Sequence, residues 1–203
     1  MTINRPIFAP EQTSKWIPLI LENVKYIIVH HAAAVFATYE SINQWHIENG
    51  WAGFGYNEYI RKDGSVYIGR GDNIGAQCAA MNSVSYGICC EGDYDNETTM
   101  PELQKLSLIE RIRVNRLRFV NFKCTALHSQ FFATSCPGKN FPLAEILKRS
   151  EVRNLTLDEA IQVLVKEGVI NGAEYRKKVC DVVNFEKEFT ISVAQKIIDL
   201  KNK

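Results

Sequence analysis

The chain has 203 residues, of which 46% are hydrophobic and 23% are charged, and its formal net charge is +1. This composition is typical of a globular protein that buries a sizeable core without disulfide support. A near-neutral chain without a basic stripe argues against a nucleic-acid partner, and no segment approaches the roughly 20 apolar residues of a membrane span. We therefore expect neither nucleic-acid binding nor membrane insertion.

The N-terminal segment indicates where the protein is made. Residues 1–18 contain Arg5, Pro6 and Lys15 and lack the apolar core of a signal peptide. We therefore expect synthesis in the cytoplasm, with no secretion route of its own. The 6 cysteines are scattered or adjacent and do not form the dense framework of a small secreted domain. We expect free thiols, at least one of them available as a metal ligand.

Strand and helix patterns follow each other through the first half of the chain. Residues 26–31 are β-branched and apolar and predict a buried strand. A helix is expected between Thr38, a suitable N-cap, and Gly50, a suitable stop. Residues 56–68 contain two apolar runs around an Asp-Gly pair and predict a β-hairpin. Residues 84–91 are apolar at successive positions, which indicates a central strand.

The next segment predicts a long helix. Thr99 and Glu102 have the spacing of a capping box, and Pro101 suits the first turn. Its apolar side is expected to comprise Leu103, Leu106, Ile109, Leu117 and Val120, with a solvated face that carries Arg111, Arg113, Arg116 and Arg118. A short strand at 124–128 and a helix at 141–148 follow. The alternation predicts an α/β domain over residues 1–150, with a mixed central sheet flanked by helices.

The pattern changes after Ser150. Thr156 and Glu159 form another capping-box spacing, and an amphipathic pattern runs from Phe189 to Leu200. Residues 151–203 therefore predict a small all-α module with balanced charges.

Histidine and cysteine residues suggest a metal site. The chain has 4 histidines, and His30 and His31 close the first predicted strand. His128 follows a short apolar stretch, and Cys136 lies in a loop eight residues beyond it. Two imidazoles and one thiolate leave a fourth tetrahedral position open for water, as in catalytic zinc sites. A lone histidine is more often structural, and packing is the favoured role for His31 and for His46 on the predicted helix.

A colinear series of motifs carries a resemblance to a known family. The series comprises Tyr26 to His31, Gln44-Trp45-His46, Gly50-Trp51, Gly55 to Ile60, Asp63-Gly64, Gly69-Arg70, Gly75-Ala76, Asn82, Ser85 to Ile88, Glu91-Gly92, His128 and Cys136-Pro137-Gly138. It resembles the type 2 N-acetylmuramoyl-L-alanine amidases, which include phage amidase endolysins and peptidoglycan recognition proteins. The resemblance covers roughly residues 26–147.

The resemblance implies roles for individual residues. His30, His128 and Cys136 correspond to the three zinc ligands of the family. Tyr56 corresponds to a tyrosine that contacts the zinc-bound water or the developing oxyanion. Thr134 stands where many phage endolysins have lysine, and its hydroxyl is a second candidate catalytic group.

Four further residues are candidates for the substrate groove. Trp51, Phe54 and Asn82 are expected to line a sugar-peptide groove. Cys78 lies where relatives often carry a groove-facing histidine, so a groove wall and a buried thiol are both open. Cys89 stands where the anhydromuramyl branch has a glutamate base, which places the chain nearer the phage and recognition-protein branch.

The resemblance implies a zinc-dependent hydrolase that cleaves the amide bond between N-acetylmuramic acid and L-alanine of peptidoglycan. A phage or prophage endolysin, released through a holin, is the favoured biological setting. The 151–203 module would then target the cell wall or mediate self-association into a homo-oligomer. Two alternatives stay open: a non-catalytic peptidoglycan-binding module on the same fold, and a protein that keeps zinc for stability alone.

Overall fold

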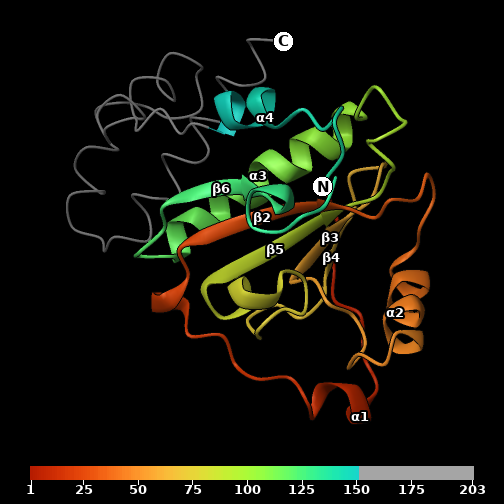
Figure 1. Ribbon diagram of the computed structural model, residues 1–203, viewed down its shortest axis with the longest axis vertical. Helices are drawn as coiled ribbons and strands as arrows, with labels where there is room; N and C mark the ends of the chain where they lie inside the picture. Colours follow the sequence, from red (N-terminus) through yellow and green to blue (C-terminus); the bar gives the residue numbers. More distant parts are fainter. Residues whose placement is uncertain (151–203) are drawn as a thin grey trace, which may run out of the picture. The chain divides into compact units, whose positions relative to one another are not determined.

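A six-stranded mixed β-sheet organises residues 1–150, the part of the chain that the computed structural model describes (Figure 1). The strand order is β1-β4-β3-β5-β2-β6. The strands are β1 (Ile3–Asn4), β2 (Tyr26–His31), β3 (Glu58–Ile60), β4 (Val66–Ile68), β5 (Ser85–Cys90) and β6 (Cys124–Leu127). β3, β5, β2 and β6 run parallel to one another, and β4 is antiparallel to β3. The predicted mixed sheet is therefore confirmed.

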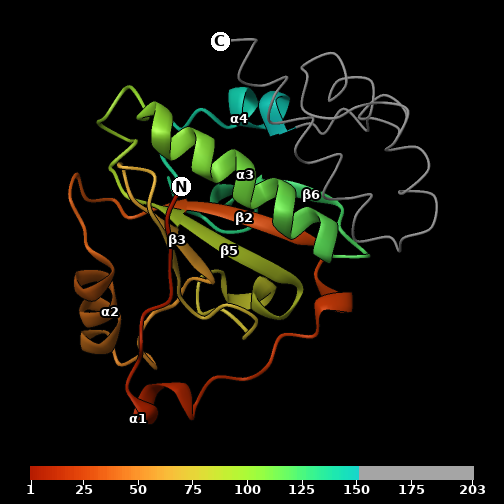
Figure 2. The ribbon, with the colours of Figure 1, turned by 180° about the vertical axis from the view of Figure 1, so that it is seen from behind.

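Four α-helices and three short 3₁₀ helices surround this sheet in the described residues. The α-helices are α1 (Pro10–Thr13), α2 (Tyr39–Glu48), α3 (Glu102–Arg118) and α4 (Leu143–Ser150). The 3₁₀ helices are η1 (Leu21–Asn23), η2 (Ala79–Val84) and η3 (His128–Gln130). Figures 1 and 2 show α3 and α4 on one side of the sheet and α2 on the other.

Side-chain alternation along the strands divides the core into two parts. Ile27 and Val29 of β2 pack with Leu108 and Ile112 in the cluster beneath α3. A smaller cluster on the opposite face combines Ala37, Ile42, Phe54, Tyr59 and Cys89. Because successive residues of a strand point to opposite faces, β2 supplies one cluster with its odd-numbered residues and leaves Ile28 and His30 for the other face.

Local signals explain the short elements near the site. The Thr38 side chain accepts a hydrogen bond from the Ser41 backbone N–H, as expected of the N-cap of α2. In the β3–β4 hairpin, Asp63 accepts hydrogen bonds from the Ser65 backbone and hydroxyl, and Gly64 has a φ of 82°. A positive φ favours glycine at that turn position.

The prediction for α3 was wrong in two respects. The helix begins at Glu102 behind Pro101, without a side-chain cap, so Thr99 and Glu102 do not form a capping box. Leu103 and Leu117 are exposed, whereas Arg111 is buried against Glu58 of β3. The sheet presents a buried carboxylate to the helix, and Arg111 faces inward to pair with it.

The predicted helical module at 151–203 lies outside the described residues. Within residues 1–150, none of the helices has the length and apolarity needed to span a bilayer. The five cysteines of this part of the chain, Cys78, Cys89, Cys90, Cys124 and Cys136, are free thiols, as expected.

Candidate metal centre and cleft

The parallel pairing of β2 with β6 brings two histidines together. Val29 of β2 is in register with Leu127 of β6, so the next residues, His30 and His128, stand at the same level of the sheet. Their ring centroids are 4.5 Å apart. The carboxyl ends of parallel strands meet at one edge of the sheet, which explains why residues almost a hundred positions apart become neighbours.

Strand alternation separates His30 from His31. The His30 ring lies on the face away from α3 and is 1% exposed. The His31 ring accepts a hydrogen bond at Nδ1 from the Tyr94 backbone N–H over 3.0 Å, and Tyr94 belongs to the core beneath α3. His31 borders the cleft described below but is not part of the metal-ligand cluster.

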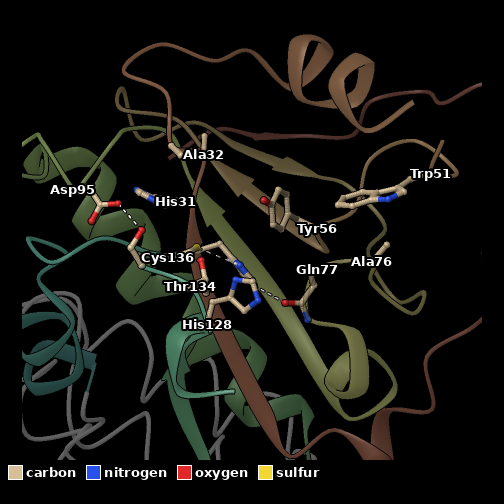
Figure 3. Close-up of a pocket in the computed structure, with 13 residues that line it drawn as sticks. His31, Ala32, Trp51, Tyr56, Ala76, Gln77, Asp95, His128, Thr134 and Cys136 are labelled. Carbon is tan, nitrogen blue, oxygen red and sulfur yellow. Dashed lines mark hydrogen bonds between the residues drawn. The ribbon is translucent and has the colours of Figure 1, made fainter. Parts of the chain in front are cut away.

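Cys136 completes the cluster from the loop that follows η3. Its carbonyl accepts a hydrogen bond from the Ser129 N–H over 2.9 Å, and its own N–H donates to Thr134 Oγ1 over 3.2 Å. Its Sγ lies 3.7 Å from His30 Nδ1. Three potential ligand atoms lie within 4.8 Å of one another, one each from His30, His128 and Cys136 (Figure 3).

Burial holds the two imidazoles in the form that binds metals. Burial, with a smaller contribution from the neighbouring His128, lowers the pKa of His30 to about 3. Burial also lowers the pKa of His128. Burial raises the pKa of the Cys136 thiol to about 12, so this thiol must lose its proton when a cation binds.

The donor set fits Zn²⁺. Imidazole nitrogen and thiolate sulfur are preferred zinc ligands, and three protein ligands leave a position for a reacting molecule. The three groups converge from the end of β2, the start of η3 and the loop that follows η3, and one side of the cluster faces the cleft. The residues present therefore fit a zinc ion held by three protein ligands beside the cleft.

The cluster lies at the wall of a cleft of about 320 Å³. The lining residues are His30, His31, Ala32, Ala33, Trp51, Tyr56, Ala76, Gln77, Asp95, His128, Thr134, Ser135 and Cys136. Figure 3 shows Tyr56 and Trp51 on the opposite side of this cleft from His128 and Thr134. The cleft therefore brings together all three predicted ligands, both candidate catalytic residues and one of the four predicted groove residues.

Tyr56 faces the cluster with its hydroxyl protonated. Its ring centroid is 5.2 Å from that of His30, and it also packs against His46 and Phe54. Burial, followed by the nearby Cys89 and Cys136 thiols, raises the pKa of Tyr56 well above its usual value. A neutral phenol in this position is a hydrogen-bond donor.

The other three predicted groove residues lie elsewhere. Phe54 is fully buried in the cluster beside α2, where it supports Tyr56, so the expectation that it lines the groove is wrong. Cys78 is 4% exposed and is a buried thiol outside the cleft lining. Asn82 turns inward, and its Oδ1 accepts hydrogen bonds from the backbone N–H groups of Gln77 and Cys78.

Sequence reasoning missed Gln77 and the pair Asp95 and Ser135. Gln77, rather than Cys78, lines the cleft, and its Oε1 lies 2.5 Å from His30 Nε2. The motif Gly75-Ala76-Gln77-Cys78 marked the correct turn but was interpreted one residue too late. Asp95 accepts a hydrogen bond from the Ser135 hydroxyl over 2.7 Å at the cleft rim, and no sequence motif indicated this pair.

His46 has the structural role that was expected. Its Nδ1 accepts a hydrogen bond from the Gly55 backbone N–H over 2.9 Å, and its ring packs against Trp51 and Tyr56. Burial, followed by the charge of Arg70, lowers its pKa to about 4. The neutral ring thus fixes the turn that precedes Tyr56.

Curated proteins similar to this chain are recognition proteins and phage lysins. Peptidoglycan-recognition protein SC1a/b of Drosophila simulans is 33% identical over 138 residues, which cover 62% of this chain and 74% of the relative. The endolysin of Enterobacteria phage K11 is 33% identical over 117 residues, which cover 55% of this chain and 75% of the endolysin.

Solved structures similar to this chain are also amidases and peptidoglycan recognition proteins. The N-acetylmuramoyl-L-alanine amidase LysC from Clostridium intestinale URNW is 31% identical with a TM-score of 0.65, and the match covers 73% of this chain and 97% of LysC. A point mutant of Drosophila PGRP-LB, solved in complex with tracheal cytotoxin, is 25% identical with a TM-score of 0.61 over 71% of this chain and 92% of that chain. The family profile Amidase_2, N-acetylmuramoyl-L-alanine amidase, matches residues 21–139. The chain therefore belongs to the N-acetylmuramoyl-L-alanine amidase family.

Proposed function

We propose that this protein is a zinc-dependent amidase that hydrolyses the bond between N-acetylmuramic acid and L-alanine in peptidoglycan. The observation that carries the proposal is the convergence of His30, His128 and Cys136 within 4.8 Å at the wall of an open cleft. Membership of the amidase family and the likeness to LysC support the same reaction.

The three ligands would hold the cation, and the chain would supply the rest of the site. A zinc ion held by these three residues would supply Lewis-acid chemistry, that is, activation of water near neutral pH and polarisation of an amide carbonyl. The two neutral imidazoles add no charge, and the Cys136 thiolate offsets one positive charge of the ion.

Two hydroxyl groups would stabilise the charge that develops on the amide oxygen. The protonated Tyr56 hydroxyl faces the cluster across the cleft and would donate a hydrogen bond to that oxygen. The Thr134 oxygen accepts from the Cys136 N–H, which leaves its own hydrogen available for a group in the cleft.

Substrate would occupy the space between the cluster and Trp51. The Trp51 side chain is 47% exposed and rests on the His46 ring at a centroid distance of 4.8 Å. A rigid indole of this kind offers an apolar wall to a sugar or a peptide stem. The tracheal cytotoxin in the PGRP-LB structure supports a peptidoglycan fragment as the class of ligand.

The endolysin relatives support a phage or prophage lysin as the biological role. In that setting the protein would be made in the host cytoplasm and reach the wall after release, through a holin. Residues 151–203 would supply wall targeting or self-association. A non-catalytic recognition module is the competing function, and the presence of Cys136 beside both histidines favours the enzyme.

The direct test is digestion of purified cell walls by the full chain and by Cys136→Ser. The proposal requires release of new amino-terminal L-alanine by the wild type and its loss in the variant. Equal release by both proteins, or wall binding by the wild type without release, would contradict the enzymatic function.

A further inference from the structure

Gln77 makes the only hydrogen bond found at the outer ring nitrogen of His30 within the described residues. The His30 Nε2 and Gln77 Oε1 atoms are 2.5 Å apart, and both side chains are buried. The other ring nitrogen, Nδ1, lies 3.7 Å from the Cys136 sulfur. The two ring nitrogens of His30 therefore have different neighbours: Nδ1 faces Cys136, and Nε2 is hydrogen-bonded to Gln77.

A chain of hydrogen bonds fixes where each hydrogen lies. The Ser85 hydroxyl has a single hydrogen and donates it to the Met81 carbonyl over 2.7 Å. The same oxygen must then accept from Gln77, whose Nε2 lies 2.8 Å away. This orientation turns the amide oxygen of Gln77 toward His30, and an amide oxygen only accepts. His30 must therefore carry its hydrogen on Nε2 and its lone pair on Nδ1.

We propose that Gln77 is a positioning residue that holds His30 in the tautomer and ring orientation required for metal binding. The inference rests on the proposed metal site and adds a supporting residue to it. A metal-ligating histidine commonly donates its second ring N–H to an acceptor that fixes tautomer and orientation. Here a neutral amide provides that acceptor, and Ser85 fixes the orientation of the amide.

The surrounding backbone leaves room for this side chain. A Cβ on Gly87 of β5 would come within 2.7 Å of the Gln77 Cγ and Cδ atoms, and one on Gly75 within 2.9 Å of Cγ. The Asn82 side chain holds the Gln77 N–H over 3.0 Å. The two glycines therefore leave space for the Gln77 side chain, and the Asn82 amide fixes its backbone.

The test measures zinc affinity of the full chain by competition with a chromophoric chelator. We expect Gln77→Ala to weaken zinc binding by about 10- to 100-fold, the usual cost of losing such a support. Gln77→Glu retains an acceptor for His30 and should bind zinc at least as tightly as the wild type. As a matched control, Gln44→Ala removes an exposed glutamine whose side chain bonds Glu48 and should leave the affinity unchanged.

Ser85→Ala distinguishes orientation from simple packing, because Ser85 bonds Gln77 and the Met81 carbonyl but not His30. In the wild-type background it frees the amide to turn its NH₂ group toward His30, and zinc binding should weaken by up to about tenfold. In the Gln77→Glu background it should have no such effect, because both carboxylate oxygens accept. Equal losses in the two backgrounds would overturn the proposed role of orientation.

A spectroscopic measurement tests the tautomer without metal or activity. Long-range ¹H–¹⁵N spectra of the metal-free wild type should show His30 protonated at Nε2 and bare at Nδ1. The positioning role would be overturned by a hydrogen on Nδ1, or by a Gln77→Glu variant whose zinc affinity is as low as that of Gln77→Ala. If the wild type itself fails to bind zinc, the proposed metal site fails together with this inference, whereas zinc binding that is indifferent to Gln77 refutes the inference alone.

Discussion

The ion pair between Glu58 and Arg111 links the sheet to α3, and its removal should destabilise the protein strongly. The Glu58 carboxylate is fully buried and accepts two hydrogen bonds of 2.7 Å from Arg111. Tyr86 and Asn115 donate the remaining two, each over 2.9 Å. In Arg111→Met the apolar volume is largely kept, but a buried anion retains only two neutral donors. Loss of one partner of a buried pair costs about 3–5 kcal/mol.

Urea unfolding monitored by circular dichroism measures this effect. With a slope of about 2 kcal/mol per molar urea, a loss of about 3–5 kcal/mol lowers the midpoint by roughly 2 M. Arg116→Met, on an exposed position of the same helix, should change the free energy of unfolding by less than about 0.5 kcal/mol. Glu58→Gln combined with Arg111→Met should recover part of the loss, because no buried charge remains. If Arg111→Met behaved like Arg116→Met, the reasoning would be refuted.

Three further predictions concern the cleft. Tyr56→Phe should keep zinc but lower wall hydrolysis by about 100-fold, the typical cost of one oxyanion donor; unchanged hydrolysis would exclude that role. The pKa of His46 is about 4 in the folded protein. Its ring in the unfolded chain takes up a proton near pH 6.5, so the stabilisation from His46 is complete above that pH and is lost as the pH falls toward 4; an NMR titration near 6.5 would contradict this. Chelation should lower the thermal midpoint of zinc-loaded wild type but not of Cys136→Ser, since zinc at about 100 times its Kd adds about 2.7 kcal/mol.

Strong local patterns made much of the fold predictable from the sequence. The apolar run of β2, the Thr38 cap of α2 and the Asp63-Gly64 turn each depend on neighbouring residues. The burial of Arg111 in α3 depends instead on Glu58, which lies in a strand 53 positions away in the chain. An arginine on a helix is usually solvated, and only the three-dimensional partner shows that Arg111 is buried.

The candidate site was predictable where residue type limits the choice. His30, His128 and Cys136 are uncommon residues at strand ends and in a loop, and the structure brings them together. Glutamine has no such chemical signature, so Gln77 was missed although its motif had been noticed. Phe54 was misplaced because its position beside Tyr56 in the sequence does not show which of the two side chains faces the cleft.

Metal content measured together with wall hydrolysis tests the central claim most directly. The proteins are the wild type, His30→Ala, His128→Ala and Cys136→Ser, with His31→Ala as the control for a neighbouring histidine outside the cluster. The structure predicts about one zinc per chain in the wild type, loss of metal and hydrolysis together in the three ligand variants, and zinc retained in His31→Ala. A metal-free wild type that still cleaves walls, or ligand variants that keep zinc and activity, would contradict the account.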